Sequence, residues 1–430
     1  MARLTALLAF LFLSCGGGDG GESVAKAGTL TEYPIVGAAT PTGAKVHLRT
    51  DAVEDVAIEY ADNKNFRNST TTSEVTTAAA NDYTVVFSLS GLSADTTYWY
   101  RVQYDGVVQS TAYVMKFTTL PSAGNFSFAV FADVAPTDRA AAAYANAKND
   151  GARFALQIGD FDHGNPSTLA EMRAMHRRVR DVSTLHGADF AQQIASKMPV
   201  VHVWDDHDYG DNDEDKNFEG RDDAWQAFDE YWPGYDRPSA DEGLWHSFVV
   251  GDAEFFVLDL RSQRDPGTDT DNSSKSMLDG DEIVDDQKDW LKAGLRTSAK
   301  TWKFIVSSVT MNPTARPAST DHWGSYETEL DELADFIADN DIEGVVVLSG
   351  DLHTGGAVDD GTNSGLATPE LCVPHTNLLA GNTANLGTWS EGVTAGARGY
   401  GLVEVTSSGV TIAAVGANGV TRHSLLIGNP

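Results

Sequence analysis

The chain has 430 residues, which exceeds the size of a single ordinary core and therefore predicts two or more domains. It contains 62 Asp and Glu residues against 30 Lys and Arg residues, and the net charge of −32 argues against nucleic acid and anionic membranes as partners. An anionic ligand would need a strong local positive charge, for which bound metal ions are the obvious source.

The N-terminal segment has the pattern of an export signal. Residues 4–13 form an apolar run that is too short to span a bilayer but suits the core of a signal peptide. Cys15 and the glycine-rich residues 16–21 follow, an arrangement that resembles a bacterial lipoprotein leader in which Cys15 is lipidated; ordinary cleavage without a lipid is the alternative. We assign residues 1–28 to a signal peptide and flexible tether. The protein is then exported, and it is either anchored in the cell envelope or secreted or periplasmic. The other cysteine, Cys372, is expected to be a buried thiol, so no disulfide framework is predicted.

The next region, residues 29–120, has an all-β pattern. Residues 89–102 (LSGLSADTTYWYRV) resemble the tyrosine corner of a fibronectin type III-like sandwich. We therefore predict a small β-sandwich here, whose role is packing and spacing. Clusters of Gly, Asp, Asn and Thr separate its predicted strands, which are residues 45–49, 56–60, 83–89, 97–104 and 113–118.

Residues 121–430 form a second predicted domain, in which apolar strands alternate with helices. Such alternation indicates sheets that are covered on both faces, so the fold class is α/β, with a two-layered β core flanked by helices. The predicted strands are residues 127–132, 154–158, 199–204, 254–258, 302–309, 344–348, 401–405, 410–415 and 422–427. The predicted helices are residues 136–149, 287–297 and 327–340.

Acidic and imidazole side chains follow these apolar strands. Because crossover connections keep the ends of parallel strands at one edge of a sheet, these side chains are expected to converge on one cleft. Buried carboxylates need neutralising cations, which predicts a metal site. Carboxylate and imidazole ligands suit Zn, Mn or Fe, and carboxylate-rich sites also suit Ca. The strand-end segments are Asp133, residues 159–163 (GDFDH), 205–208 (DDHD), 259–261 (DLR), 310–312 (TMN) and 349–353 (SGDLH).

The order of three of these segments resembles the calcineurin-like metallophosphoesterases. They are Gly159-Asp160, then residues 206–208, then residues 350–353. Residues 204–208 (WDDHD) and 348–353 (LSGDLH) resemble, more closely, the alkaline phosphatase D (PhoD-like) family, and the likeness runs from about Tyr33 to the C-terminus. That family also carries an N-terminal β-sandwich, so the resemblance implies a metallophosphoesterase domain over residues 121–430.

The resemblance implies roles for five residues. Asp160 would bridge two metal ions. Asp206, Asp351 and His353 would be further metal ligands. His207 would lie beside the scissile ester as a general acid or a phosphate clamp.

Two positions depart from the family pattern. Asp133 stands where the family often has a cysteine, and His163 stands where it often has a tyrosine. Both can bind metal, so at least two ions are expected, either Ca with Fe or a Zn/Mn site. Asn312 is a further candidate ligand. Arg261 is a candidate catalytic residue that either holds the substrate phosphate or forms a salt bridge to Asp259 or another nearby carboxylate.

These features predict an exported metal-dependent hydrolase of small phosphate monoesters or diesters, and no protein partner is inferred. One alternative keeps the same site but acts on phospholipid, teichoic-acid-like or nucleotide diesters. The alternative from another class is a non-catalytic calcium-binding surface protein.

Overall fold

The computed structural model describes residue 30 and residues 32–136, 138–238, 243–279, 286–378 and 381–430. The predicted signal peptide and tether, with Cys15, lie outside the described residues. Within the described part, none of the helices combines the length and the apolar character that crossing a bilayer requires. Cys372 is fully buried, as predicted.

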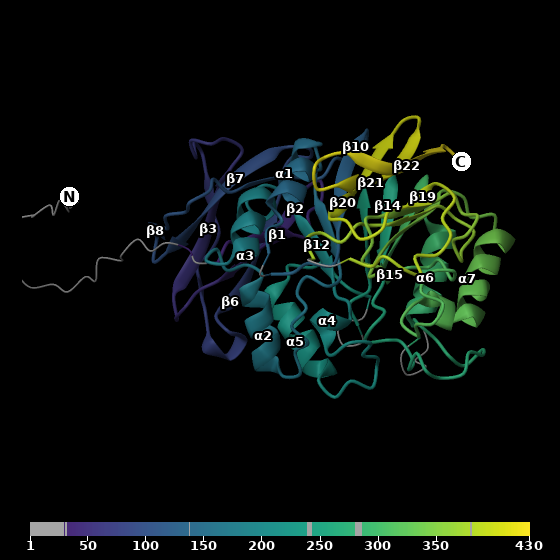
Figure 1. The fold of residues 1–430 in the computed structure, drawn as a ribbon. Coiled ribbons are helices and arrows are strands. Elements are labelled where there is room, and N and C mark those ends of the chain that lie inside the picture. Colours follow the sequence, from purple (N-terminus) through teal and green to yellow (C-terminus); the bar gives the residue numbers. More distant parts are fainter. Residues whose placement is uncertain (1–29, 31, 137, 239–242, 280–285, 379–380) are drawn as a thin grey trace, which may run out of the picture.

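Two antiparallel sheets form the N-terminal part of the structure (Figure 1). The hydroxyl of Tyr98 accepts a hydrogen bond from the Ser93 backbone N–H at 2.9 Å, which is the contact expected of a tyrosine corner. One sheet has the order β1 (Ile35–Gly37), β2 (Gly43–Arg49), β6 (Thr84–Ser90). The other has the order β4 (Thr70–Thr71), β3 (Asp55–Ala61), β7 (Thr97–Tyr104), β8 (Val107–Val108), with β5 (Val75–Thr76) beside β3 and β9 (Lys116–Thr118) beside β7. The 3₁₀-helix η1 (Ala79–Asn81) precedes β6.

Two larger sheets form the rest of the β structure. The first has the order β12 (Val200–Val203), β11 (Ala155–Ile158), β10 (Phe126–Phe131), β20 (Gly399–Thr406), β21 (Gly409–Gly416), β22 (Thr421–Gly428). The second has the order β13 (His246–Val250), β14 (Ala253–Val257), β15 (Trp302–Val309), β16 (Val345–Gly350), β18 (Glu370–Cys372), β17 (Ala357–Asp359), β19 (Gly392–Val393). Strands β10, β11 and β12 are parallel to one another, as are β14, β15, β16 and β18.

Aromatic side chains fill the space between the two larger sheets. Phe128 of β10 meets Phe255 of β14 and Phe304 of β15, with ring centroids 5.1 and 5.4 Å apart. All three rings are fully buried, and each contributes about 1.5–3 kcal/mol of apolar burial. This contact holds the two sheets face to face, with their strand ends at a common edge.

Helices cover the outer faces of both sheets (Figure 1). On the second sheet, leucines of α6 (Gln287–Thr297) and α7 (Glu327–Asp339) pack with β14, β15 and β16. The helices are α1 (Ala141–Asn149), α2 (Leu169–Arg178), α3 (Leu185–Phe190) with the π-helical turn Ala191–Ala195, α4 (Asp206–Tyr209), α5 (Arg221–Tyr231), α6 (Gln287–Thr297), the 3₁₀-helix η3 (Trp323–Ser325) and α7 (Glu327–Asp339). The α/β fold class predicted from the sequence is confirmed.

The predicted helix 136–149 is too long at its start. The helix begins only at Ala141, because the buried Asp189 carboxylate accepts the backbone N–H groups of Ala140 and Ala141 at 3.1 and 3.0 Å and caps the first turn. The preceding residues instead form a loop, which the Asn377 side chain binds at the backbone of Ala135. A capping partner distant in sequence therefore sets this helix boundary.

Candidate active site

Four aspartates lie just beyond the carboxyl ends of parallel strands. Asp133 follows β10, Asp160 follows β11, Asp205 follows β12 and Asp351 follows β16. The backbone of Asp133, Asp160 and Asp351 is left-handed, with φ of 55°, 51° and 60°. His353 shares this conformation, with φ of 53°. Such conformations are costly for residues other than glycine and concentrate at functional sites, where they aim side chains away from the direction of the strand.

Asp160 is the centre of the cluster. It belongs to three groups of side chains whose potential ligand atoms all lie within 4.8 Å of one another. The three groups are Asp160 with His163 and His207, Asp160 with Asp133 and His353, and Asp160 with Asp205 and Asp351. One carboxylate shared by adjacent groups is the arrangement that a bridging ligand requires.

The carboxylates at the centre lack ordinary partners. All four carboxylate oxygens of Asp133 and Asp160 are buried, and none accepts a hydrogen bond. Nε2 of His163 lies 3.2 Å from Oδ2 of Asp160, and Nε2 of His353 lies 3.3 Å from Oδ1 of Asp133. Nδ1 of His163 lies 2.9 Å from the Val134 carbonyl, which turns Nε2 toward Asp160. The imidazoles are therefore the nearest groups that could offset the buried negative charge.

The ionisation of the cluster reflects this crowding. Burial alone would raise the pKa of Asp160, but contacts with His163 and His353 outweigh it and hold the pKa well below its usual range. Burial would lower the pKa of His353, but Asp133 and Asp160 raise it to about 11. Burial raises the pKa of Asp351 to about 7 although Arg316 opposes the shift, and it raises the pKa of Asp205 well above the usual range despite Arg261. The cluster as a whole therefore favours bound positive charge.

Metal ions fit this set of residues. Buried carboxylate oxygens without hydrogen bonds, together with imidazole Nε2 atoms, are the donors that transition metals and calcium take in proteins. Six of the residues predicted from the sequence meet here: Asp133, Asp160, His163, His207, Asp351 and His353.

Asp206 lies outside the groups around Asp160, and its neighbour Asp205 lies within one of them. Asp205 lies with Asp160 and Asp351, whereas Asp206 groups with Asp213 and Asp321. Both Asp206 oxygens accept backbone N–H groups, from His207 at 2.9 Å and from Asp213 at 2.8 Å. Asp205 has one oxygen held by Ser308 and Arg261, while its Oδ2 is buried without a partner. Asp205 is thus the carboxylate available to a metal ion.

Of the two roles expected for Arg261, the structure favours a salt bridge to nearby carboxylates over contact with the substrate. Its side chain is completely buried, and the guanidinium is bonded to Asp205 and, at 2.6 and 3.2 Å, to Asp321. Its partners are thus nearby carboxylates other than Asp259. A guanidinium that is buried and paired in this way cannot reach a substrate; it fixes the orientation of Asp205 instead.

Asn312, a further predicted ligand, has both ends of its side-chain amide engaged in hydrogen bonds. Its Oδ1 accepts from the backbone N–H and the hydroxyl of Thr314, at 2.9 and 2.7 Å, and its Nδ2 donates to the Thr388 carbonyl at 2.8 Å. These bonds occupy both ends of the amide, so Asn312 shapes the loop after β15 rather than the metal cluster.

Two residues of the site were missed. The sequence did contain a signal for Asp205 as a site residue, because Asp205 directly follows an apolar strand. Arg316 had none: it lies in the loop after β15, with φ of 45°, and its Nη1 donates to Oδ2 of Asp351 at 2.8 Å. The Arg316 side chain is 22% exposed to solvent. It is therefore a cation at the cluster that solvent can reach.

Comparison with known proteins gives consistent matches. The family model for PhoD-like phosphatase matches residues 142–376, and the model for the N-terminal domain of PhoD-like phosphatases matches residues 37–121. Alkaline phosphatase D of Bacillus subtilis (strain 168) is 29% identical in an alignment 216 residues long, and the match covers 43% of this chain. The chain spans 35% of the length of that curated relative.

Two solved structures share the fold. A structure of PhoD superimposes with a TM-score of 0.74 at 18% identity, covering 93% of this chain and 91% of the other. Purple acid phosphatase PPD1 from yellow lupin seeds superimposes with a TM-score of 0.64 at 11% identity, covering 92% of this chain and 74% of the other. The metallophosphoesterase-like architecture expected from the motifs is confirmed.

Proposed function

Because the chain belongs to the PhoD-like phosphatase family, we propose that it hydrolyses small phosphate esters at the metal cluster centred on Asp160. The observation that carries this proposal is the position of Asp160, a buried carboxylate without hydrogen bonds that three overlapping groups of potential ligands share. A purely structural aspartate at a strand end would have its oxygens bonded to the backbone, as those of Asp206 are.

The ligands divide around this shared carboxylate. Asp133 and His353 would hold one metal ion on one side of Asp160, and Asp205 and Asp351 would hold a second on another side. When bound, the ions supply positive charge to the phosphoryl oxygens and lower the pKa of the attacking water. Calcium with iron, and zinc or manganese, are the metal sets that these ligands suit, and metal analysis distinguishes them.

His207 is suited to handle the leaving group. Its Nδ1 is hydrogen-bonded to Oδ1 of Asn165, and Nδ2 of Asn165 donates to Asp211 at 2.9 Å. The acceptor at Nδ1 fixes the proton on that nitrogen and leaves Nε2 to face the ester. In the imidazolium form of the ring, which carries a proton on each nitrogen, Nε2–H then donates its proton to the oxygen that departs from phosphorus.

Arg316 provides the fixed positive charge that the ester itself needs. The acidic chain and the carboxylate cluster repel a phosphate group, and Arg316 combines a contact to Asp351 with partial exposure. The guanidinium N–H groups that do not bind Asp351 would donate to a phosphoryl oxygen.

The proposed substrates are phosphate monoesters or diesters. The proposed location is outside the cytoplasm, because the chain is expected to be exported. An apolar run at residues 4–13 followed by Cys15 supports export, with lipid attachment as one form of it. Phosphodiesterase activity on phospholipid, teichoic-acid-like or nucleotide diesters uses the same residues.

The test combines metal analysis with an ester panel. The purified protein is assayed with para-nitrophenyl phosphate and bis-para-nitrophenyl phosphate before and after chelation, and its bound metals are quantified. Asp160→Asn should lower turnover by at least about 100-fold and reduce the metal content, while Asp331→Asn, an exposed change on α7, should leave both unchanged. Bound calcium without turnover of either ester would instead indicate the non-catalytic calcium-binding protein.

A further inference from the structure

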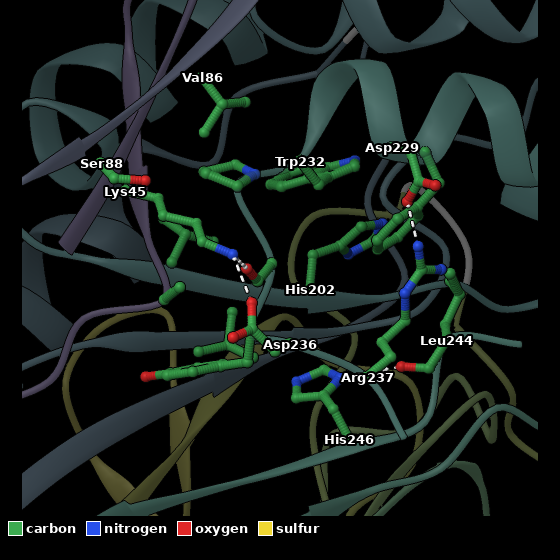
Figure 2. A pocket seen from close by; sticks show the side chains of 17 residues that line it. Lys45, Val86, Ser88, His202, Asp229, Trp232, Asp236, Arg237, Leu244 and His246 are labelled. Atoms are coloured by element: carbon green, nitrogen blue, oxygen red, sulfur yellow. Dashed lines mark hydrogen bonds and ion pairs between the residues drawn. The ribbon is translucent and has the colours of Figure 1, made fainter. Parts of the chain in front are cut away.

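Strand β12, which has Asp205 and His207 just beyond its end, is supported on one side only within its sheet. In the part of the chain that the structure describes, it is an edge strand whose hydrogen-bonded neighbour is β11. Its first half, including His202, borders a cavity of about 520 Å³ between the N-terminal sheets and the segment after α5 (Figure 2). The position of the strand end therefore also depends on contacts made beyond the strand itself.

Asp208 makes such contacts. It lies in α4, and its side chain is buried, with the residue only 4% exposed. Oδ1 accepts the backbone N–H groups of Phe161 and Asp162 at 2.9 and 3.2 Å, and Oδ2 accepts that of Asp205 at 3.3 Å. One buried carboxylate thus connects the loop after β11 to the end of β12.

The same contacts stabilise the backbone of Asp160. This residue has a left-handed conformation with φ of 51°, which is costly for a residue that has a side chain. Successive backbone N–H groups at such a turn form a concave site that binds an anion. Here the N–H groups of the next two residues, Phe161 and Asp162, both donate to Oδ1 of Asp208. The Asp208 carboxylate therefore favours the backbone conformation that Asp160 adopts in the cluster.

Asp208 differs from the proposed metal ligands. Both of its oxygens accept hydrogen bonds, whereas the two carboxylate oxygens of Asp160 and Oδ2 of Asp205 accept none. Among the described residues, it belongs to none of the groups of potential ligands. Any influence of Asp208 on the cluster must therefore act through the residues that it holds.

We propose that Asp208 is a positioning residue of the metal cluster. Its hydrogen bonds hold the loop after β11 against the end of β12, and so keep Asp160 and Asp205 close enough to bind one metal ion together. They also keep His207 beside His163, with ring centroids 4.6 Å apart. This inference rests on the proposed function, but the hydrogen bonds of Asp208 can be tested without metal or substrate.

Asp208→Asn preserves the size of the side chain but replaces one acceptor oxygen with an NH₂ group. Either Asp205 or the loop after β11 then loses its hydrogen bonds. Hydrogen–deuterium exchange of the metal-free protein, measured by mass spectrometry, should accelerate at least about tenfold in a peptide that covers residues 159–164 or residues 203–209.

The same variant should bind metal less tightly. Equilibrium dialysis with Zn²⁺ and, separately, with Ca²⁺ should show at least about tenfold weaker binding of one of the two ions. The kcat for para-nitrophenyl phosphate should fall at least about tenfold while KM changes less than about threefold, because Arg316 still receives the phosphate.

Asp189→Asn is the matched control. Asp189 is equally buried, at 3% exposure, and its carboxylate also accepts two backbone N–H groups, those of Ala140 and Ala141, but it caps α1 rather than a strand-end loop. The control should lose stability without a change in metal affinity or kcat. Asp208→Glu is a second variant, which keeps the charge but moves the carboxylate by one methylene. It should show the losses of Asp208→Asn, and it replaces that variant if Asp208→Asn does not fold.

Faster exchange together with weaker metal binding supports the positioning role. Unchanged exchange in Asp208→Asn, full recovery in Asp208→Glu, or an equal loss of metal affinity in Asp189→Asn overturns it. If the unsubstituted protein binds metal but hydrolyses no ester, only the proposed function fails, because exchange and metal affinity still decide the role of Asp208. If the unsubstituted protein binds no metal, both proposals are overturned.

Discussion

Gly159 and Asp205 approach each other so closely that no side chain fits between them. A Cβ on Gly159 would lie 2.4 Å from the Cβ of Asp205, and the φ of Gly159 is 95°. Because Gly159 directly precedes Asp160, this contact sets how near the ends of β11 and β12 can come. The two aspartates can share one site only because residue 159 has no side chain.

Gly159→Ala should therefore separate the two strand ends. We expect a loss of roughly 1–3 kcal/mol of stability from overpacking and a fall in kcat/KM of at least about tenfold. Gly124→Ala is the matched control, since Gly124 also has a positive φ, of 87°, but nothing lies near its Cβ position. Thermal melts and steady-state kinetics measure both effects. Equal losses of activity in the two variants would show that backbone strain alone is responsible.

The assignment of Asp205 in place of Asp206 is directly testable. Asp205→Asn should reduce metal content and lower turnover by more than about 100-fold, because its unpartnered Oδ2 would be the ligand atom. Asp206→Asn keeps an oxygen that can accept a backbone N–H group and should cost less than about tenfold. Metal quantification beside para-nitrophenyl phosphate turnover separates the two. A larger loss in Asp206→Asn would restore the original assignment.

Asn165 is expected to orient the His207 ring. Asn165→Ala removes the acceptor at Nδ1 and should lower kcat by about tenfold with a smaller change in KM, since the ring can then rotate or change tautomer. Asn165→Asp keeps an acceptor oxygen for Nδ1 but loses the donor to Asp211, so it should recover part of the activity. If both variants are impaired alike, Asn165 serves the loop rather than His207.

Arg316 should contribute to phosphate binding. Arg316→Gln removes the charge, and we expect inhibition by inorganic phosphate to weaken about tenfold. The metal content should stay the same, because Arg316 contacts Asp351 but is no ligand itself. Competition assays with inorganic phosphate give the change. Unaltered inhibition combined with altered metal content would assign Arg316 to the support of Asp351 alone.

Buried His186 should make the fold sensitive to mild acid. Burial lowers its pKa to about 4, even though the Val179 carbonyl 3.2 Å from Nδ1 opposes the shift, and the Tyr144 hydroxyl lies 2.8 Å from Nε2. An unfolded histidine has a pKa of about 6.5, so between these values the unfolded chain binds a proton that the folded protein does not. Stability from this group is complete above about pH 6.5 and is lost as the pH falls toward about 4, by at most about 3 kcal/mol.

Urea unfolding at several pH values across this window measures the loss. His186→Gln keeps an acceptor for Tyr144 but does not titrate, so its stability should depend less steeply on pH than that of the unsubstituted protein. Parallel pH profiles for the two proteins would assign the acid sensitivity to other groups.

Most of the elements that carry the site could be predicted from the sequence. The helix at residues 287–297 and the strand at residues 302–309 were placed with their observed bounds, because strong apolar periodicity marks both. Helices α2, α3 and α5 were missed. The hydrogen bonds that fix local boundaries, such as those from Asp189 to the start of α1, come from residues far away in the chain.

The sequence by itself determined that carboxylates and imidazoles follow successive buried strands, and parallel strands bring such ends to one edge. That reasoning identified Asp133, Asp160, Asp351 and His353. Only the tertiary structure could choose between Asp205 and its neighbour, because a shift of one residue in a loop reverses the direction in which a side chain points.

The roles of Arg261 and of the cavity between the sheets were likewise decided by the tertiary structure. From the sequence, Arg261 was a candidate for binding the substrate phosphate. In the structure it is a buried salt-bridge partner of Asp205 and Asp321, because elements distant in the chain pack around it. The cavity exists only where the N-terminal sheets meet α5 and β13. Burial and pairing depend on neighbours in space, and the order of residues along the chain does not specify these neighbours.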